Sequence, residues 1–139
     1  MRWIYEKFNI YIYLIIPVFI TSIYFLCFKD FQLSKIQNYN QYNFEFVLTM
    51  LGALLTILGL MFTLPENNYR RLMKKYKHDE IINNTIFSGI ISSLVFIVLL
   101  IIEVLPSIQE FLFITVICEV LIASWWMYRT LKNITSSVS

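Results

Sequence analysis

Four long runs of uncharged residues fill most of this chain and restrict what it can fold into. The runs extend over residues 8–28, 46–65, 81–102 and 111–128, and only Glu119 interrupts them. An α-helix needs about 20 apolar residues to cross a hydrocarbon core of about 30 Å, and lipid offers no partners to exposed backbone N–H and C=O groups. The sequence therefore predicts an all-α, polytopic membrane protein with four transmembrane helices. We expect these helices at about residues 8–28, 46–64, 82–103 and 109–128.

The composition favours one membrane domain without a soluble part. Hydrophobic residues make up 58% of the chain and charged residues 14%, which is about half the charged share of soluble domains. The connections between the runs are too short to fold separately, so we expect residues 1–139 to form a single transmembrane domain. Any soluble activity would then come from a partner protein.

The distribution of Lys and Arg predicts the orientation. Short cytoplasmic loops of membrane proteins carry an excess of these residues. If the four helices alternate in direction, one side of the membrane receives nine of the 11 basic residues, namely Arg2, Lys7, Arg70, Arg71, Lys74, Lys75, Lys77, Arg129 and Lys132. The other side receives Lys29 and Lys35. We therefore expect both termini and the loop of residues 66–82 to be cytoplasmic.

Three features are expected to shape the connections. Pro17 removes a helical hydrogen bond and clashes with the preceding turn, so it predicts a bend in the first helix, either a packing kink or a hinge. Residues 29–44 are rich in Gln, Asn and Tyr and are expected to connect the first two helices as an interfacial helix, a mobile loop or a binding surface. Residues 103–109, with Pro106 among them, predict a tight turn between the last two helices.

Small residues recur at helical spacing in two of the runs. Small side chains let helix backbones approach closely in lipid. Both stripes therefore predict helix packing, within one subunit or between subunits, and their hydroxyl groups leave open a water-filled path in an assembly of several copies. The second run carries Gly52, Thr56, Gly59 and Thr63, and the third carries Thr85, Ser88, Gly89, Ser92 and Ser93.

A basic segment follows the second run. Apolar residues in it have helical spacing, at Tyr69, Leu72, Met73 and Tyr76, and the basic residues around them are Arg70, Arg71, Lys74, Lys75 and Lys77. Three interpretations remain open: a topology signal, contact with anionic lipid headgroups, or docking to an acidic surface on a cytoplasmic partner. The segment has no nucleic-acid readout motif, so we expect no direct nucleic-acid binding.

Glu119 is the strongest candidate for a functional residue. It follows Glu110 by nine residues, which places it about 13 Å deeper at 1.5 Å per residue. A carboxylate near the middle of a bilayer costs about 3 kcal/mol, so the side chain is expected to face protein or water. Thr115 shares its face, and Ser92, Ser93, Thr21 and Ser22 are candidate hydrogen-bond partners. A structural role, an ion path and a proton-carrying role all remain open.

Enzyme chemistry finds no support in the sequence. The chain has one histidine, His78, and only three glycines, so neither a zinc site nor a glycine-rich phosphate loop can be proposed. No pair of carboxylates suits acid–base catalysis. We expect no catalytic activity, no cofactor and no metal.

The chain resembles the small four-span membrane proteins of bacterial anti-phage systems, such as the Kiwa membrane subunit and the membrane protein of lambda Rex exclusion. The segments that carry the resemblance are Ile15-Ile16-Pro17, Phe28-Lys29 and Arg70-Arg71-Leu72. A Kiwa-type protein implies a homo-oligomer, such as a tetramer, in the bacterial inner membrane that senses infection or membrane disturbance and signals to a soluble DNA-binding partner. A Rex-type protein implies an ion channel that depolarises the cell. A small proton-coupled transporter is a third alternative, with membrane lipid as a further partner in every case.

Overall fold

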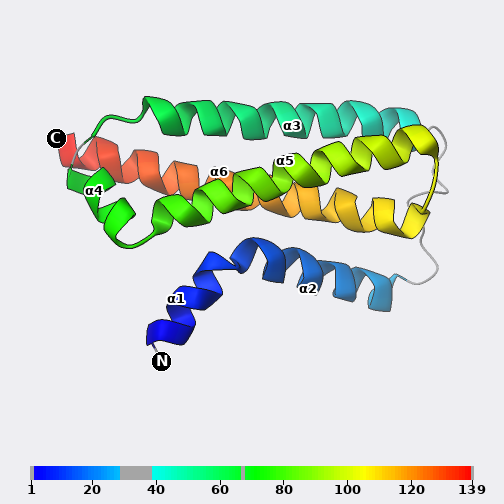
Figure 1. Cartoon of the computed structure of the whole chain (residues 1–139), viewed down its shortest axis with the longest axis horizontal. Coiled ribbons are helices and arrows are strands. Elements are labelled where there is room, and N and C mark those ends of the chain that lie inside the picture. Colours follow the sequence, from blue (N-terminus) through cyan, green and yellow to red (C-terminus); the bar gives the residue numbers. More distant parts are fainter. Residues whose placement is uncertain (1, 29–38, 67, 139) are drawn as a thin grey trace.

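The computed structural model describes residues 2–28, 39–66 and 68–138, and these residues form an all-α protein (Figure 1). Its helices in chain order are α1 Arg2–Ile10, α2 Ile12–Cys27, α3 Tyr39–Thr63, α4 Asn68–Lys75, α5 His78–Ile102 and α6 Pro106–Val138.

The three longest helices form the body of the molecule. In Figure 1, α3, α5 and α6 lie side by side and alternate in direction, and α5 packs on both of the others. Helix α2 packs mainly on α6, while α4 lies across the end of the bundle where α3 ends and α5 begins. The N-terminus, α4 and the C-terminus all lie toward that end (Figure 1).

The length and composition of these helices define a multi-pass membrane protein. Three helices, α3, α5 and α6, are long and apolar enough to cross a membrane. Helix α2 is also apolar but has 16 residues, about 24 Å at 1.5 Å per residue. The predicted all-α fold with membrane-spanning helices is confirmed for α3, α5 and α6. The first predicted helix is shorter than expected, because α2 has 16 residues.

The first predicted helix, at residues 8–28, is divided into two. The interruption lies at Tyr11 (φ −97°, ψ 11°), whereas Pro17 lies inside α2. A proline ring meets the carbonyl of the residue four positions before it, here Tyr13. The break at Tyr11 lies beyond that residue, so the helix is not interrupted where Pro17 predicted a bend. The Thr21 hydroxyl donates to the Pro17 carbonyl at 2.7 Å.

Polar residues extend two of the helices beyond the predicted limits. Helix α3 begins at Tyr39 instead of residue 46, because Tyr39 and Asn43 are one turn apart and both are buried. The expected connection of residues 29–44 is therefore partly helical, and its residues 29–38 lie outside the described part. Helix α6 continues to Val138 instead of ending near residue 128, because Thr130 and Ile134 are also buried.

Helix α5 begins four residues before the predicted start at residue 82 and ends one residue before the predicted end at residue 103. It begins at His78, after Lys77 in the left-handed region (φ 57°), and Asp79 and Glu80 occupy its first turn, where acidic groups stabilise a helix N-terminus. After α5, the turn contains only residues 103–105, because Pro106 already belongs to α6. Proline suits the first position of a helix, since that N–H has no intrahelical partner.

Two apolar clusters fill the bundle. The cluster nearer α4 contains the buried residues Leu54, Ile57, Met61, Met73, Ile82, Ile86, Ala123 and Met127. The cluster nearer the opposite end contains Tyr39, Val47, Phe96 and Leu100, with Phe46 and Phe113 packed against them. We call them the inner and the outer cluster. Along α6, Glu119 lies between these two clusters.

Candidate functional site

The carboxyl group of Glu119 is enclosed at the centre of the bundle. The side chain projects from α6 and has no exposed surface. The Ser88 hydroxyl of α5 donates a hydrogen bond to its Oε1 atom, and Ser92 lies beside the same carboxyl group, one turn further along α5. The Oε2 atom is buried without a hydrogen-bond partner. One oxygen of this buried carboxyl group is therefore satisfied by protein, and the other has no hydrogen-bond partner.

Gly89 makes this close approach possible. A Cβ atom at Gly89 would lie 2.7 Å from Cδ1 of Leu54 on α3 and 3.3 Å from Oε2 of Glu119. Both distances are shorter than an ordinary van der Waals contact, so a larger residue would force the Leu54 and Glu119 side chains to shift. The glycine of α5 thus allows three helices to meet at the carboxyl group.

The other predicted neighbours of Glu119 bond within their own helices. The Ser93 hydroxyl donates to the Gly89 carbonyl at 2.7 Å, and the Thr115 hydroxyl donates to the Phe111 carbonyl at 2.8 Å. Thr85, another member of the α5 stripe, is buried and bonds the Ile81 carbonyl in the same way. On α2, Thr21 and Ser22 bond the carbonyls of Pro17 and Val18. Of the expected partners, only Ser92 lies at the carboxyl group, and Ser88, which was not among them, donates the hydrogen bond to Oε1.

A groove between α2 and α5 approaches this site from the side. It has a volume of about 390 Å³ and is lined by Tyr13, Leu14, Asn84, Phe87, Ser88, Ile91 and Ser92. Two of these residues, Ser88 and Ser92, also lie at the Glu119 carboxyl group. A single layer of hydroxyl groups thus separates the carboxyl group from the groove.

A second buried carboxyl group belongs to Glu110. Its side chain is 4% exposed, and the Tyr24 hydroxyl of α2 donates to Oε2 at 3.2 Å. Tyr39 and Asn43 lie buried nearby on α3. Their four-residue spacing, one helical turn, was the sequence signal for this cluster. This cluster was not predicted, because residues 29–44 were expected to connect the first two helices.

Aromatic packing separates the two carboxyl groups. The ring centroids of Phe96 and Phe113 are 6.1 Å apart, and those of Phe46 and Phe113 are 5.1 Å apart. These rings belong to the outer cluster, between Glu110 and Glu119 along α6. On its other side, Glu119 meets the inner cluster, so the bundle interior is apolar in both directions.

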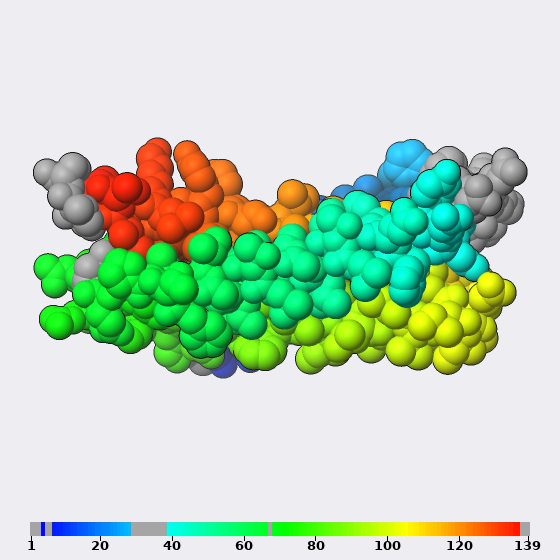
Figure 2. Space-filling view, turned by 90° about the horizontal axis from the view of Figure 1, so that it is seen from above, coloured from blue at the N-terminus to red at the C-terminus, as the bar shows by residue number. Residues whose placement is uncertain are grey.

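The small residues of α3 lie on its outward face, which forms the middle of the surface in Figure 2. Gly52, Thr56, Gly59 and Thr63 are all exposed, and a Cβ atom at either glycine would meet nothing within 4 Å. The Thr56 hydroxyl donates to the Gly52 carbonyl at 2.8 Å. Of the two predicted packing stripes, only the one on α5 therefore packs within the chain.

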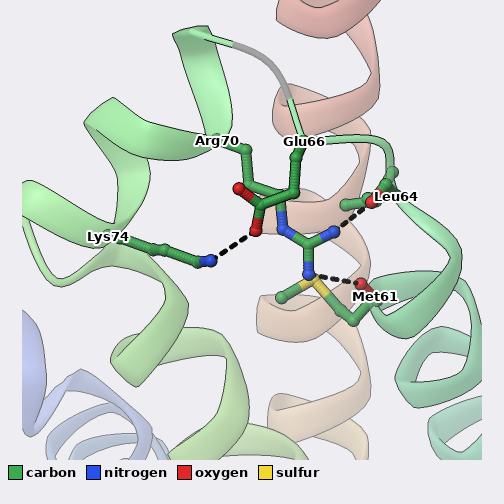
Figure 3. Close-up of polar contacts among 5 residues, drawn as sticks. All are labelled: Met61, Leu64, Glu66, Arg70 and Lys74. Atoms are coloured by element: carbon green, nitrogen blue, oxygen red, sulfur yellow. Dashed lines mark hydrogen bonds and ion pairs between the residues drawn. The ribbon is translucent and has the colours of Figure 1, made fainter.

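The basic segment forms α4, and two of its side chains bind the end of α3 and the residues that follow it (Figure 3). The Arg70 guanidinium donates to the Leu64 carbonyl and, at 3.2 Å, to the Met61 carbonyl. Lys74 forms an ion pair with Glu66 at 2.6 Å (Figure 3), and this ammonium group lowers the pKa of the Glu66 carboxyl. Arg70 thus satisfies carbonyl groups that a helix C-terminus leaves without partners.

The remaining side chains of α4 divide into a packed and an exposed set. Met73 is buried in the inner cluster, and the Tyr69 hydroxyl accepts a hydrogen bond from Asn133 of α6 at 2.9 Å. Leu72 and Tyr76, expected on the same face, are exposed instead. The predicted contact residues Arg71, Lys75 and Lys77 are exposed as well.

The fold and this site define a multi-pass helical membrane protein with a carboxyl group enclosed at the centre of its bundle. No protein-family model, curated protein or solved structure matches the chain. Within residues 2–28, 39–66 and 68–138, no three His, Cys, Asp or Glu side chains lie close enough together to hold a metal ion.

Proposed function

We propose that the chain crosses the bacterial inner membrane four times, with α2 as the first crossing and α4 and both termini in the cytoplasm. The basic residues support this orientation: Arg71, Lys75, Lys77, Arg129 and Lys132 are exposed at the α4 end of the bundle. At the opposite end, the described residues 21–28, 39–50 and 95–112 contain no Lys or Arg. A crossing helix as short as α2 is accommodated by local thinning of the bilayer.

We further propose that the protein senses a disturbance of the membrane and signals to a soluble cytoplasmic partner. The observation that carries this proposal is the continuous packing between Glu119 and α4. Leu54, which lies against Gly89 beside the carboxyl group, belongs to the same inner cluster as Met73 of α4. Because packed interiors transmit displacements, a shift of α5 against α6 would move α4 and its exposed basic face.

The resemblance to anti-phage membrane proteins leads us to propose that the disturbance is phage infection at the inner membrane. Expression of the chain with its neighbouring genes should lower the plating efficiency of some phages, and Glu119→Leu should abolish that protection. Equal plating with and without the wild-type protein, across a broad phage panel, would contradict the assignment to defence.

Docking of the partner is tested by charge reversal on the exposed basic face. The triple variant Arg71→Glu, Lys75→Glu, Lys77→Glu should abolish co-purification of the partner. Arg70 and Lys74 are left intact because their side chains hold α4 in place through the Met61 carbonyl and Glu66. Arg129→Glu with Lys132→Glu, on α6, is the control that reverses exposed basic residues at the same end of the bundle but outside α4. Unchanged co-purification by the triple variant would overturn docking at α4.

Self-association through the outward face of α3 belongs to the same proposal. Gly52 and Gly59 leave this face open to a second helix, and small residues are typical of helix interfaces in lipid. Gly52→Leu with Gly59→Leu should convert the oligomer into a monomer in nanodiscs, whereas Leu48→Ile on the same helix should not. A wild-type protein that is monomeric in nanodiscs would contradict this part.

An ion channel is the second candidate, and the polar groove beside Glu119 is the observation that favours it. A path along the axis of one bundle is blocked by the inner and outer clusters, so conduction would need several copies around the α2–α5 groove. Potential-driven ion flux into liposomes, lost in Glu119→Gln, would favour the channel. No flux from inserted, oligomeric protein would favour the sensor.

A further inference from the structure

The groove between α2 and α5 combines apolar walls with polar groups in the middle of a membrane-spanning helix. Tyr13, Asn84, Ser88 and Ser92 contribute hydroxyl or amide groups, and Leu14, Phe87 and Ile91 contribute apolar surface. Its volume of about 390 Å³ lies within the range of small-molecule sites, which are mostly apolar with a few placed polar groups. Polar groups at this depth are costly beside lipid and mark functional paths.

The carboxyl group behind the groove lacks a counter-charge. No basic side chain pairs with Glu119 among the described residues. The hydroxyl groups beside its carboxyl group belong to Ser88, which donates to Oε1, and to Ser92, and both residues line the groove. The Oε2 atom is fully buried and has no partner. An isolated carboxylate in an apolar interior is strongly unfavourable, so the group either takes up a proton or pairs with a cation that approaches it.

We propose that the groove binds a membrane-soluble organic cation, with its positive group at the hydroxyl layer of Ser88 and Ser92 and its apolar body against Phe87 and Ile91. The aromatic rings of Tyr13 and Phe87 suit a cation further, because ring faces attract positive charge. A divalent metal ion fits less well, since it takes six or more oxygen ligands, largely carboxylates, and this site offers one carboxylate. The assignment goes beyond the proposed sensor function and does not depend on it.

The test uses two probes of the same shape and opposite charge. Purified full-length protein in zwitterionic nanodiscs is equilibrated with tetraphenylphosphonium or with tetraphenylborate, and protein-free nanodiscs measure partition into lipid. We expect saturable binding of the cation only. Glu119→Gln should weaken it about tenfold or more, because the amide keeps the shape and the Ser88 hydrogen bond but removes the charge.

Ile91→Trp tests the groove without touching the carboxyl group. Ile91 is 60% exposed, so the larger ring should fill the groove and block binding without disturbing the fold. Phe62→Trp on α3, where Phe62 is 79% exposed, is the matched control and should bind as wild type does. Tryptophan fluorescence and gel filtration verify folding of each variant.

Three outcomes would overturn the proposal. Equal binding to wild-type and protein-free nanodiscs would mean partition into lipid alone. Loss of binding in Ile91→Trp but not in Glu119→Gln would mean that the groove takes a neutral apolar occupant, such as a lipid chain. Saturable binding of tetraphenylborate with the same affinity would exclude recognition of charge.

Discussion

The stripes of α3 and α5 both consist of small residues at helical spacing, but their surroundings differ. On α5, Gly89 lies against Leu54 and Glu119, whereas Gly52 and Gly59 of α3 have nothing near the position of a Cβ atom. The stripe on α5 holds three helices together around a carboxyl group. The stripe on α3 faces outward from the bundle. Helical spacing of small residues therefore identifies helix faces that permit close packing. Which of these faces is packed within the chain depends on where the neighbouring helices lie.

The largest expected difference between the two stripes comes from adding one methyl group. Gly89→Ala should lower the free energy of unfolding by about 1–3 kcal/mol, because its Cβ would overpack the site. Within a single subunit, Gly59→Ala should cause no loss, since its Cβ meets open space. Unfolding in mixed detergent micelles, followed by tryptophan fluorescence, measures both.

A second variant sharpens this contrast. In a Leu54→Ala background, Gly89→Ala should cost less than in the wild type, because the closest clash, 2.7 Å to Leu54 Cδ1, is removed. Additive effects would mean that the α5 stripe does not pack as the structure has it.

The next largest effect contrasts enclosed and open contacts at α4. Arg70→Ala should destabilise the protein by about 1.5 kcal/mol, because charge-assisted bonds to two carbonyls at the end of α3 are lost. Lys74→Ala should have a smaller effect, since its pair with Glu66 is exposed. Hydrogen exchange of α4 measures both variants, and equal protection loss would contradict the distinction.

A smaller difference is expected from hydroxyl groups on the two stripes. Ser88→Ala should cost about 1 kcal/mol, because the Glu119 Oε1 atom loses its donor in the interior. Thr56→Ala should leave stability unchanged, because that exposed hydroxyl bonds only its own helix at the Gly52 carbonyl. Detergent unfolding of both variants provides the comparison, and a larger loss in Thr56→Ala would reverse it.

The smallest effect is a pH dependence at the exposed pair of Glu66 and Lys74. Because Lys74 lowers the pKa of Glu66 below its ordinary value of 4.5, the pair stabilises α4 fully above that pH and is lost as the pH falls through the lowered pKa. Hydrogen-exchange protection of α4 should therefore decrease slightly below pH 4.5. Glu66→Gln should remove this step, and an unchanged step in that variant would assign it to another group.

The membrane-spanning helices were predictable because the constraint that creates them is local. A run of apolar residues in lipid has no alternative to the helix, so the interiors of α3, α5 and α6 follow from composition. Their ends were not predictable in the same way. From the sequence, Tyr39 and Asn43 were expected in a polar connection between two helices. In the structure both are buried and belong to the first turns of α3.

Part of the candidate site was likewise predictable from the sequence, and part was not. The cost of a carboxyl group in a bilayer already implied that Glu119 faces protein or water and not lipid. The choice of Ser88 among several hydroxyl groups, and the burial of Glu110 beside Tyr24, depend on how the helices are rotated and aligned lengthwise.

The sequence by itself determined a helical, membrane-spanning chain with an acid in its last crossing, because backbone hydrogen bonding and transfer from water to lipid act residue by residue. Only the tertiary structure decided that Gly89 admits Leu54 and Glu119, that the α3 glycines stay open, and that a groove runs beside the acid. These features depend on the rotation and register of helices far apart in sequence, which packing of the whole bundle fixes.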